Sequence, residues 1–175
     1  VPTIGEKTLA ESIAALESQT LPPVDIVVVE NVSPFIAAMN KGIQKVDTPF
    51  FVQCDADMIL DPDCLATLRG AMTEKTGVSI GYLNDEMLGT IQAVKLYRTE
   101  NLKRSPFEDS ITSDSDRIKK MRAEGSWIAF ASREAPAHGH AADVLGNHRP
   151  NYNDPVYLYG KFSVMGAAVR NRNSY

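Results

Sequence analysis

Residues 50–60 read FFVQCDADMIL, an apolar run that ends in two aspartates one residue apart. The first three residues have the character of a buried strand, and the ligands of open α/β sheets collect where strands end. Residues i and i+2 of an extended chain lie on the same side, so Asp55 and Asp57 can face one hard metal ion or one metal-bound phosphate. The stretch therefore predicts a cation site at the end of a central strand.

Strand-like and helix-like patterns alternate before and after this stretch. Leu9, Ile13 and Leu16 repeat at helical spacing, and Asp25 to Glu30 is a continuous β-branched run that is typical of a strand covered on both faces. The first 75 residues thus predict three strands (1–5, 25–30 and from 50), each followed by a helix (6–18, from 33 and from 61). This order favours an α/β fold with a doubly wound, mostly parallel mixed sheet and helices on both faces.

The second half of the chain predicts shorter elements. We expect strands at 78–83, 91–97 and 127–130, a helical turn at 99–103 and a polar helix at 113–124. Residues 139–175 are expected to form a mobile loop and closing tail, with a helix at 156–169 and a mobile stretch at 141–155. We expect one domain across 1–175, whose short first strand is either truncated or completed by a partner or a homo-oligomer.

Composition excludes several classes of protein. The 175 residues are 43% hydrophobic and 23% charged, with a net charge of −4, which argues against a nucleic-acid-binding protein. No apolar segment reaches membrane-spanning length, although peripheral membrane contact stays open. Cys54 and Cys64 offer neither a disulfide framework nor a zinc spacing, so we expect a cytoplasmic protein.

Several segments together resemble the family 2 glycosyltransferases, inverting enzymes of the GT-A fold. The opening VPTIGEKTLAESIAALESQTLPPVDIVVVEN, the Asn40-Lys41-Gly42 triplet and the DAD at 55–57, placed like a DxD motif, follow the order of that family. IQAVKLYRTENLKRSPFED at 91–109 and SDSDRIKKMRAEG at 113–125 are similar to its later segments. His138 stands where a late metal-binding histidine is expected, whereas we assign His140 and His148 to the surface.

The resemblance implies a reaction and a role for each matching residue. A UDP-sugar would donate its sugar to a saccharide or glycolipid acceptor, with Mn²⁺ or Mg²⁺ stabilising the departing nucleotide diphosphate. Asp57, Asp55 and His138 would bind the metal, Asp55 either directly or through water, and Asp114 would be the general base with Asp109 as its rival. The residues implied to contact the nucleotide are Pro2, Thr3, Glu30, Asn40, Asp55 and Ala56, and the Glu30 carboxylate could accept a uracil or guanine N–H.

Two other functions stay open. An apolar strand that ends in Asp-x-Asp also suits a haloacid-dehalogenase-like phosphohydrolase, in which the first acid is the nucleophile and the second the acid/base. A degenerate transferase domain that only binds nucleotide is favoured by Ser113, which replaces the glutamate usual before the base. Asp114 and Asp116 could also serve only as acids at a helix start, where the helix dipole favours them.

Overall fold

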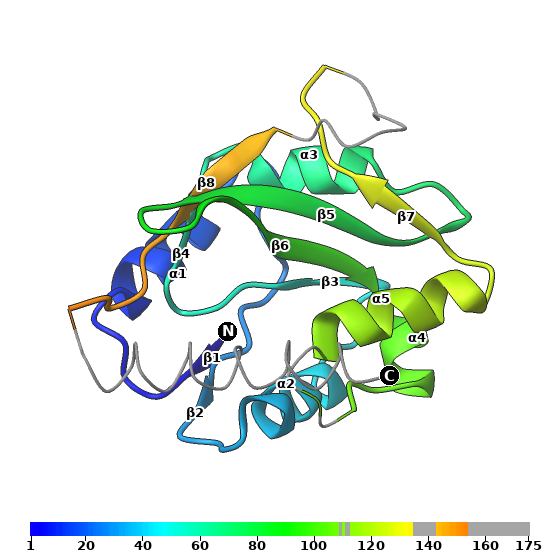
Figure 1. Ribbon diagram of the computed structural model, residues 1–175, viewed down its shortest axis with the longest axis horizontal. Coiled ribbons are helices and arrows are strands. Elements are labelled where there is room, and N and C mark those ends of the chain that lie inside the picture. Colours follow the sequence, from blue (N-terminus) through cyan, green and yellow to red (C-terminus); the bar gives the residue numbers. More distant parts are fainter. Residues whose placement is uncertain (109, 111–112, 135–142, 154–175) are drawn as a thin grey trace, which may run out of the picture.

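The computed structural model describes residues 1–108, 110, 113–134 and 143–153, and its strands form two separate sheets (Figure 1). The small sheet pairs β1 (Pro2–Thr3) in parallel with β2 (Val29–Glu30). The large sheet has the strand order β3-β6-β5-β8-β4, and β7 also pairs with β5. Its strands are β3 (Phe50–Gln53), β4 (Met58–Leu60), β5 (Thr76–Asp85), β6 (Gly89–Arg98), β7 (Trp127–Phe130) and β8 (Val144–His148).

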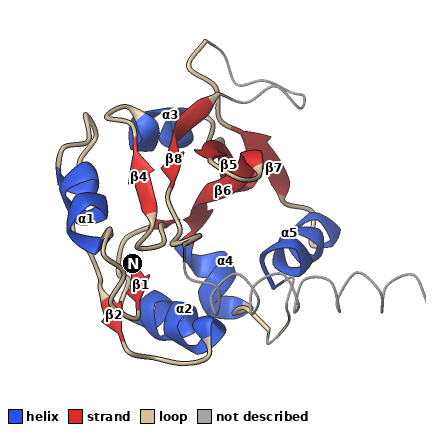
Figure 2. Cartoon of the chain, turned by 60° about the vertical axis from the view of Figure 1, so that its left-hand side comes forward, coloured by secondary structure: helices blue, strands red, loops and turns tan. Residues whose placement is uncertain are grey.

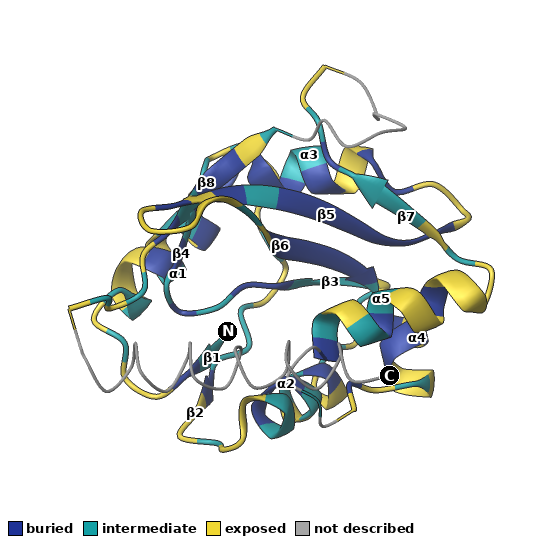
Figure 3. Cartoon of the chain, in the orientation of Figure 1, coloured by how far each residue is buried: buried dark blue, intermediate teal, exposed yellow. Residues whose placement is uncertain are grey.

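Helices cover both faces of the large sheet (Figures 1 and 2). They are α1 (Leu9–Glu17), α2 (Phe35–Gln44), α3 (Cys64–Gly70), α4 (Thr99–Arg104) and α5 (Ser113–Ala123). Side chains of α1 and α3 pack with one set of strand residues, and side chains of α2, α4 and α5 pack with another. The sheet therefore separates two hydrophobic cores, and most of β5 and residues 93–97 of β6 are buried (Figure 3).

Strand β6 shows how the sheet divides its side chains. Val94 and Leu96 belong to the core that contains α3, while Tyr97 belongs to the core that contains α5. Successive side chains of a strand point to opposite faces, so Lys95 shares the face of Tyr97. This alternation directs a buried lysine toward α5.

The elements with the strongest sequence periodicity agree with their predictions. The helix predicted at 6–18 is α1, the polar helix at 113–124 is α5, and the strands at 78–83 and 91–97 form the β5–β6 hairpin. The mixed α/β class is also confirmed. The closing helix at 156–169 and the extent of the domain to residue 175 lie outside the described residues and stay predictions.

Two short strands were not predicted. β4 follows the aspartate pair directly, and β8 lies inside the stretch 141–155 that we expected to be mobile. β8 is held between β5 and β4, and Leu145 and Gly146 are buried. The prediction failed because Gly, Asn and Pro around β8 read locally as a loop, whereas pairing on both sides of this strand supplies its stability.

Two further expectations about strands are corrected. Among the described strands of the large sheet, three pairings are antiparallel and two are parallel, so this sheet is mixed but not mostly parallel. The run 25–30 forms a strand only at Val29 and Glu30, because β1 offers it a partner just two residues long. A β-branched run needs a paired neighbour as well as propensity to become a strand.

Candidate active site

Asp55 and Asp57 lie in the tight connection between β3 and β4. The Met58 N–H donates to the Asp55 carbonyl at 3.1 Å, and the Thr8 hydroxyl donates to the Ala56 carbonyl at 2.9 Å. The backbone of the connection is thus fixed from within and by the segment that enters α1. Oδ1 of each aspartate is buried and has no hydrogen-bond partner among the described residues. Two buried carboxylate oxygens without donors are suited to a cation.

His148 is the histidine that reaches this connection. Met58 of β4 pairs with His148 of β8, and this register brings Nε2 of the imidazole to 3.3 Å from Oδ2 of Asp57. The Arg149 N–H donates to the Asp57 carbonyl at 2.7 Å, which holds the two strands together. His148 is 8% exposed, so its assignment to the surface was wrong. His138 and His140 lie outside the described residues.

Asp114 faces the same region from the first turn of α5. Its Oδ2 accepts hydrogen bonds from the Lys95 ammonium at 2.9 Å and from the Gln53 amide at 3.4 Å. Lys95 is 5% exposed and also donates to the Ala93 carbonyl at 3.1 Å. A lysine this deeply buried needs a carboxylate partner, so the pair fixes both side chains. Asp109, the rival base, lies outside the described residues.

Asp55 interacts electrostatically with each of these groups. Burial raises the pKa of Asp55 to about 7, with further upward contributions from the Asp57 and Asp114 carboxylates and opposing ones from Lys95 and His148. Like charges and burial both disfavour an ionised carboxylate. A bound cation would relieve this cost.

The residues expected to contact a nucleotide lie in three places, and Asp55 and Ala56 belong to the connection between β3 and β4. Pro2, Thr3 and Glu30 lie side by side in the β1–β2 pair, where the Thr3 hydroxyl donates to Glu6 and the Glu30 side chain is exposed. Asn40 is engaged elsewhere, because its amide both donates to the Phe107 carbonyl at 2.9 Å and accepts the Phe107 N–H at 3.1 Å. We refer to this pair of bonds as the Asn40 clamp, which ties α2 to the segment before α5.

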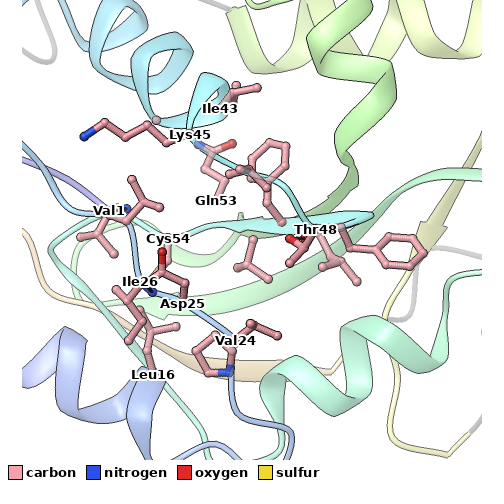
Figure 4. A pocket seen from close by; sticks show the side chains of 18 of the residues that line it. Val1, Leu16, Val24, Asp25, Ile26, Ile43, Lys45, Thr48, Gln53 and Cys54 are labelled. Atoms are coloured by element: carbon pink, nitrogen blue, oxygen red, sulfur yellow. Dashed lines mark hydrogen bonds between the residues drawn. The ribbon is translucent and has the colours of Figure 1, made fainter.

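An apolar cavity of about 550 Å³ lies beside β3 (Figure 4). Val1, Leu16, Val24 and Ile26 line it, together with the side chains of β3. The carboxylates and His148 do not line this cavity. The cavity adjoins the charged site at Gln53, which lines the cavity and donates to Asp114.

The aspartate connection and His148 offer donor atoms of the kinds that bind divalent cations. Among the described residues there is no ready cluster of three or more His, Cys, Asp or Glu side chains arranged around a metal. Asp55, Asp57 and His148 nevertheless provide two carboxylates and an imidazole, with two unbonded buried oxygens. Carboxylate and imidazole ligands suit Mn²⁺ and, less well, Mg²⁺. The types of donor atom, rather than a ready coordination geometry, match such an ion.

Nδ1 of His148 lies 2.6 Å from Oδ2 of Asp85. Sequence reasoning missed three residues of this site, namely Lys95, His148 and Asp85. Lys95 carried a signal, because a lysine in the middle of the apolar strand AVKLY needs a buried partner. His148 carried a weaker one, the apolar pair Val144-Leu145 just before it. Asp85 ends a strand but was read as part of a polar turn.

The fold is that of known glycosyltransferases. A mannosyltransferase from Pyrobaculum calidifontis, solved in complex with GDP-Man and Mn²⁺, superposes with a TM-score of 0.69 at 14% identity, covering 97% of this chain and 62% of that one. TarS from S. aureus superposes with a TM-score of 0.64 at 16% identity, covering 77% of this chain and 57% of that one. The chain therefore spans about three fifths of the length of these structures.

The family follows from the sequence itself. Residues 33–130 match the model of glycosyl transferase family 2, and the chain belongs to this family. No curated protein matches the chain. Within the part of the chain that the structure describes, no helix is both long and apolar enough to span a bilayer. Family membership sets aside the phosphohydrolase alternative.

Proposed function

We propose that this chain provides the donor-binding and catalytic centre of a metal-dependent, inverting glycosyltransferase that uses a nucleotide-diphosphate sugar. The observation that carries the proposal is that Nε2 of His148 lies 3.3 Å from Oδ2 of Asp57, beside Asp55. Asp114 of helix α5 faces the same region and is held there by Lys95 of β6. The family and the GDP-Man and Mn²⁺ complex of the mannosyltransferase support the same reading. We favour UDP as the nucleotide and a saccharide or glycolipid as the acceptor.

Asp55, Asp57 and His148 would hold the divalent cation. When bound, the cation would stabilise the negative charge of the leaving nucleotide diphosphate. In the protein alone, the carboxylates repel one another, and His148 offsets this repulsion only partly. His148 takes the role that we had expected of His138, which stays an untested alternative.

Asp114 is our candidate for the general base. Both of its described hydrogen bonds end on Oδ2, so Oδ1 is available to an acceptor hydroxyl. The Lys95 ammonium donates to Oδ2 at 2.9 Å and so holds the carboxylate in place. An ionised carboxylate held in one orientation is what abstraction of a hydroxyl proton requires. Asp109 remains the alternative base.

Nucleotide binding is assigned to the edge formed by β1, β2 and the aspartate connection. Glu30 is exposed and could accept an N–H of uracil or guanine, while Pro2, Thr3 and Ala56 supply backbone and small side chains close to the ring or ribose. Asn40 would act indirectly through its clamp on Phe107. Because Glu30 could accept an N–H of either base, the binding of UDP and of GDP should be measured side by side.

The proposal is tested by nucleotide release from UDP-sugars and GDP-sugars with Mn²⁺, using water as the acceptor. Asp57→Ala should abolish metal-dependent nucleotide binding in calorimetry. Asp114→Asn should preserve binding and lower the release rate by roughly 10²–10⁴-fold, the usual effect of losing a general base. Asp116→Asn is the matched control, because it makes the same change two residues away on α5.

The outcomes separate the alternatives. A nucleotide-binding module would bind nucleotide and Mn²⁺ without turnover. Full turnover in Asp114→Asn would move the base to Asp109 or elsewhere. Equal losses in Asp114→Asn and Asp116→Asn would indicate damage to α5 and would contradict the assigned role.

A further inference from the structure

Helix α5 covers only one half of the β5–β6 hairpin. A Cβ added to Gly77 would lie 2.8 Å from the terminal methyl of Met121, so the last turn of α5 packs on the start of β5. The first turn of α5 lies over Lys95, which bonds to Asp114 and pairs with Ile80 in the middle of the hairpin. The half of the hairpin that leads to its turn therefore lies beyond the end of α5 that carries Asp114 (Figure 1).

An extra residue in β6 decides which side chains this outer half presents. Lys95 pairs with Ile80 and Gln92 pairs with Tyr82, so a step of three residues in β6 matches a step of two in β5. Such a β-bulge reverses the facing of the residues beyond it on the bulged strand. Ile91 accordingly packs against the core that contains α3, and Gln92 reaches the Tyr82 hydroxyl on the opposite face. Strict alternation from Lys95 would instead direct Gln92 into that core.

The outer half of the hairpin has a polar and aromatic face on the side of α5. Its four residues, which we call the hairpin face, are Tyr82, Asn84, Thr90 and Gln92, and the register pairs the first with the last and the second with the third. The Gln92 amide donates to the Tyr82 hydroxyl at 3.2 Å, and the Tyr82 ring stacks on Phe130 with ring centroids 6.1 Å apart. Tyr82 is half-buried, whereas the other three residues of the hairpin face are exposed.

The bulge also joins the hairpin face to the candidate base. The Lys95 ammonium donates to the Ala93 carbonyl at 3.1 Å and to Oδ2 of Asp114 at 2.9 Å, so one group bonds to both. Ala93 follows Gln92 directly in the chain, and the hairpin face therefore begins one residue away from this link to Asp114. Bulges occur often next to active sites, where they redirect a side chain.

The chemistry of the hairpin face matches a sugar ring. A sugar has an apolar C–H surface, which packs against an aromatic ring, and hydroxyl groups, which bond to amides and hydroxyls. Sites for small ligands likewise combine aromatic surface with a few polar groups that fix the orientation of the ligand. A lipid tail would need an apolar surface, whereas Asn84, Thr90 and Gln92 are polar.

We propose that the hairpin face binds the acceptor of the reaction and that it recognises a saccharide, whose hydroxyl it places at Asp114. The inference rests on the proposed function, because it takes Asp114 as the general base of a sugar transfer. Tyr82 packs against the sugar ring, and Gln92 and Asn84 bond to its hydroxyls. The recognised part of the acceptor is thus a sugar ring rather than a lipid tail.

The experiment separates acceptor binding from donor binding. UDP-sugars and GDP-sugars are supplied with Mn²⁺, and methyl glycosides of the common hexoses, deoxyhexoses and N-acetylhexosamines serve as acceptors. Nucleotide release and the formation of a disaccharide, detected by mass spectrometry, are measured together. Tyr82→Ala removes the ring, and Gln92→Ala removes the amide. Tyr82→Phe keeps the ring, and Gln44→Ala, at the exposed end of α2, is the matched control for Gln92→Ala.

We expect at least one methyl glycoside to accept a sugar from the wild type. Tyr82→Ala and Gln92→Ala should each raise the KM for that glycoside up to about tenfold, the effect of losing one aromatic contact or one hydrogen bond, with little change in the KM for the donor. Tyr82→Phe and Gln44→Ala should stay close to the wild type. Gln92 is exposed, so its variant tests the proposal even where Tyr82→Ala loosens the stack on Phe130.

Three results would overturn the assignment and leave the proposed function intact. The first is nucleotide release into water with no transfer to any glycoside. The second is a rise in the KM for the donor instead of the glycoside, because the hairpin face would then bind the donor sugar. The third is an equal loss in Tyr82→Phe and Tyr82→Ala, since the ring would then have no role in packing. Release of nucleotide from none of the donors would overturn the proposed function itself.

Discussion

Replacing Asp55 by asparagine should make the metal-free protein more stable at neutral and alkaline pH. The pKa of Asp55 is raised from 3.8 to about 7, first by burial and then by Asp57 and Asp114. Between these pH values the folded protein holds a proton that the unfolded chain has lost. The free energy of unfolding therefore falls as the pH rises from about 4 to about 7 and levels off above it. Asparagine does not titrate and removes this fall.

The size of the effect follows from the pKa shift. One pKa unit corresponds to about 1.4 kcal/mol, so the penalty at pH 8 is at most about 4 kcal/mol. In a protein of this length, 1 kcal/mol moves the melting temperature by about 2–4 °C. Asp55→Asn should therefore melt up to about 8–16 °C above the wild type at pH 8, and much closer to it at pH 4.

The assay is thermal unfolding of both proteins in a chelator at pH values from 4 to 8.5. Asp47→Asn is the control, because the Asp47 side chain is 98% exposed and its replacement should leave the difference from wild type independent of pH. Adding Mn²⁺ should raise the melting temperature of the wild type more than that of Asp55→Asn. A difference between Asp55→Asn and wild type that stays constant across this pH range would refute the reasoning.

Three other substitutions test how the site is held. Gly146→Ala should destabilise the protein by about 3 kcal/mol in urea unfolding, because the added Cβ would lie 2.4 Å from a β4 carbonyl oxygen. Gly70→Ala is its control, because the added Cβ there meets nothing within 4 Å. An equal loss of stability in Gly70→Ala would contradict the steric explanation. Asn40→Ala should cost about 2 kcal/mol by opening the Asn40 clamp, and an unchanged urea midpoint would show that the clamp is dispensable. Lys95→Met should lower kcat at least about tenfold with little change in the KM for the donor, because it releases Asp114, whereas a rise in KM alone would place Lys95 in donor binding.

The local sequence pattern was enough to predict the helices and strands whose own residues show a clear periodicity. The helical spacing of Leu9, Ile13 and Leu16 located α1, and the apolar run before Asp55 located β3. It also put the two aspartates at a strand end, since that position depends only on neighbouring residues. The polar helix with Asp114 in its first turn was found in the same way.

Strands without such periodicity were not predictable. β8 has one fully buried apolar side chain, Leu145, and a glycine at φ 147° whose missing Cβ lets β4 approach. The apolar run from Asp25 had the opposite fate, because high β propensity without a paired neighbour left only Val29 and Glu30 in a strand. In both cases pairing with a distant strand outweighed local preference.

The sequence by itself determined the fold class, the aspartate pair and the acidic helix, because each of these is written in residues close together in the chain. Only the tertiary structure decided that His148 approaches Asp57 and that Lys95 holds Asp114. Asp85 and His148 are 63 residues apart and meet through strand register, and Lys95 reaches Asp114 because alternation along β6 points it toward α5. The strand register, and the face of the sheet to which each side chain points, depend on how all the strands pair. No short segment of sequence contains that information.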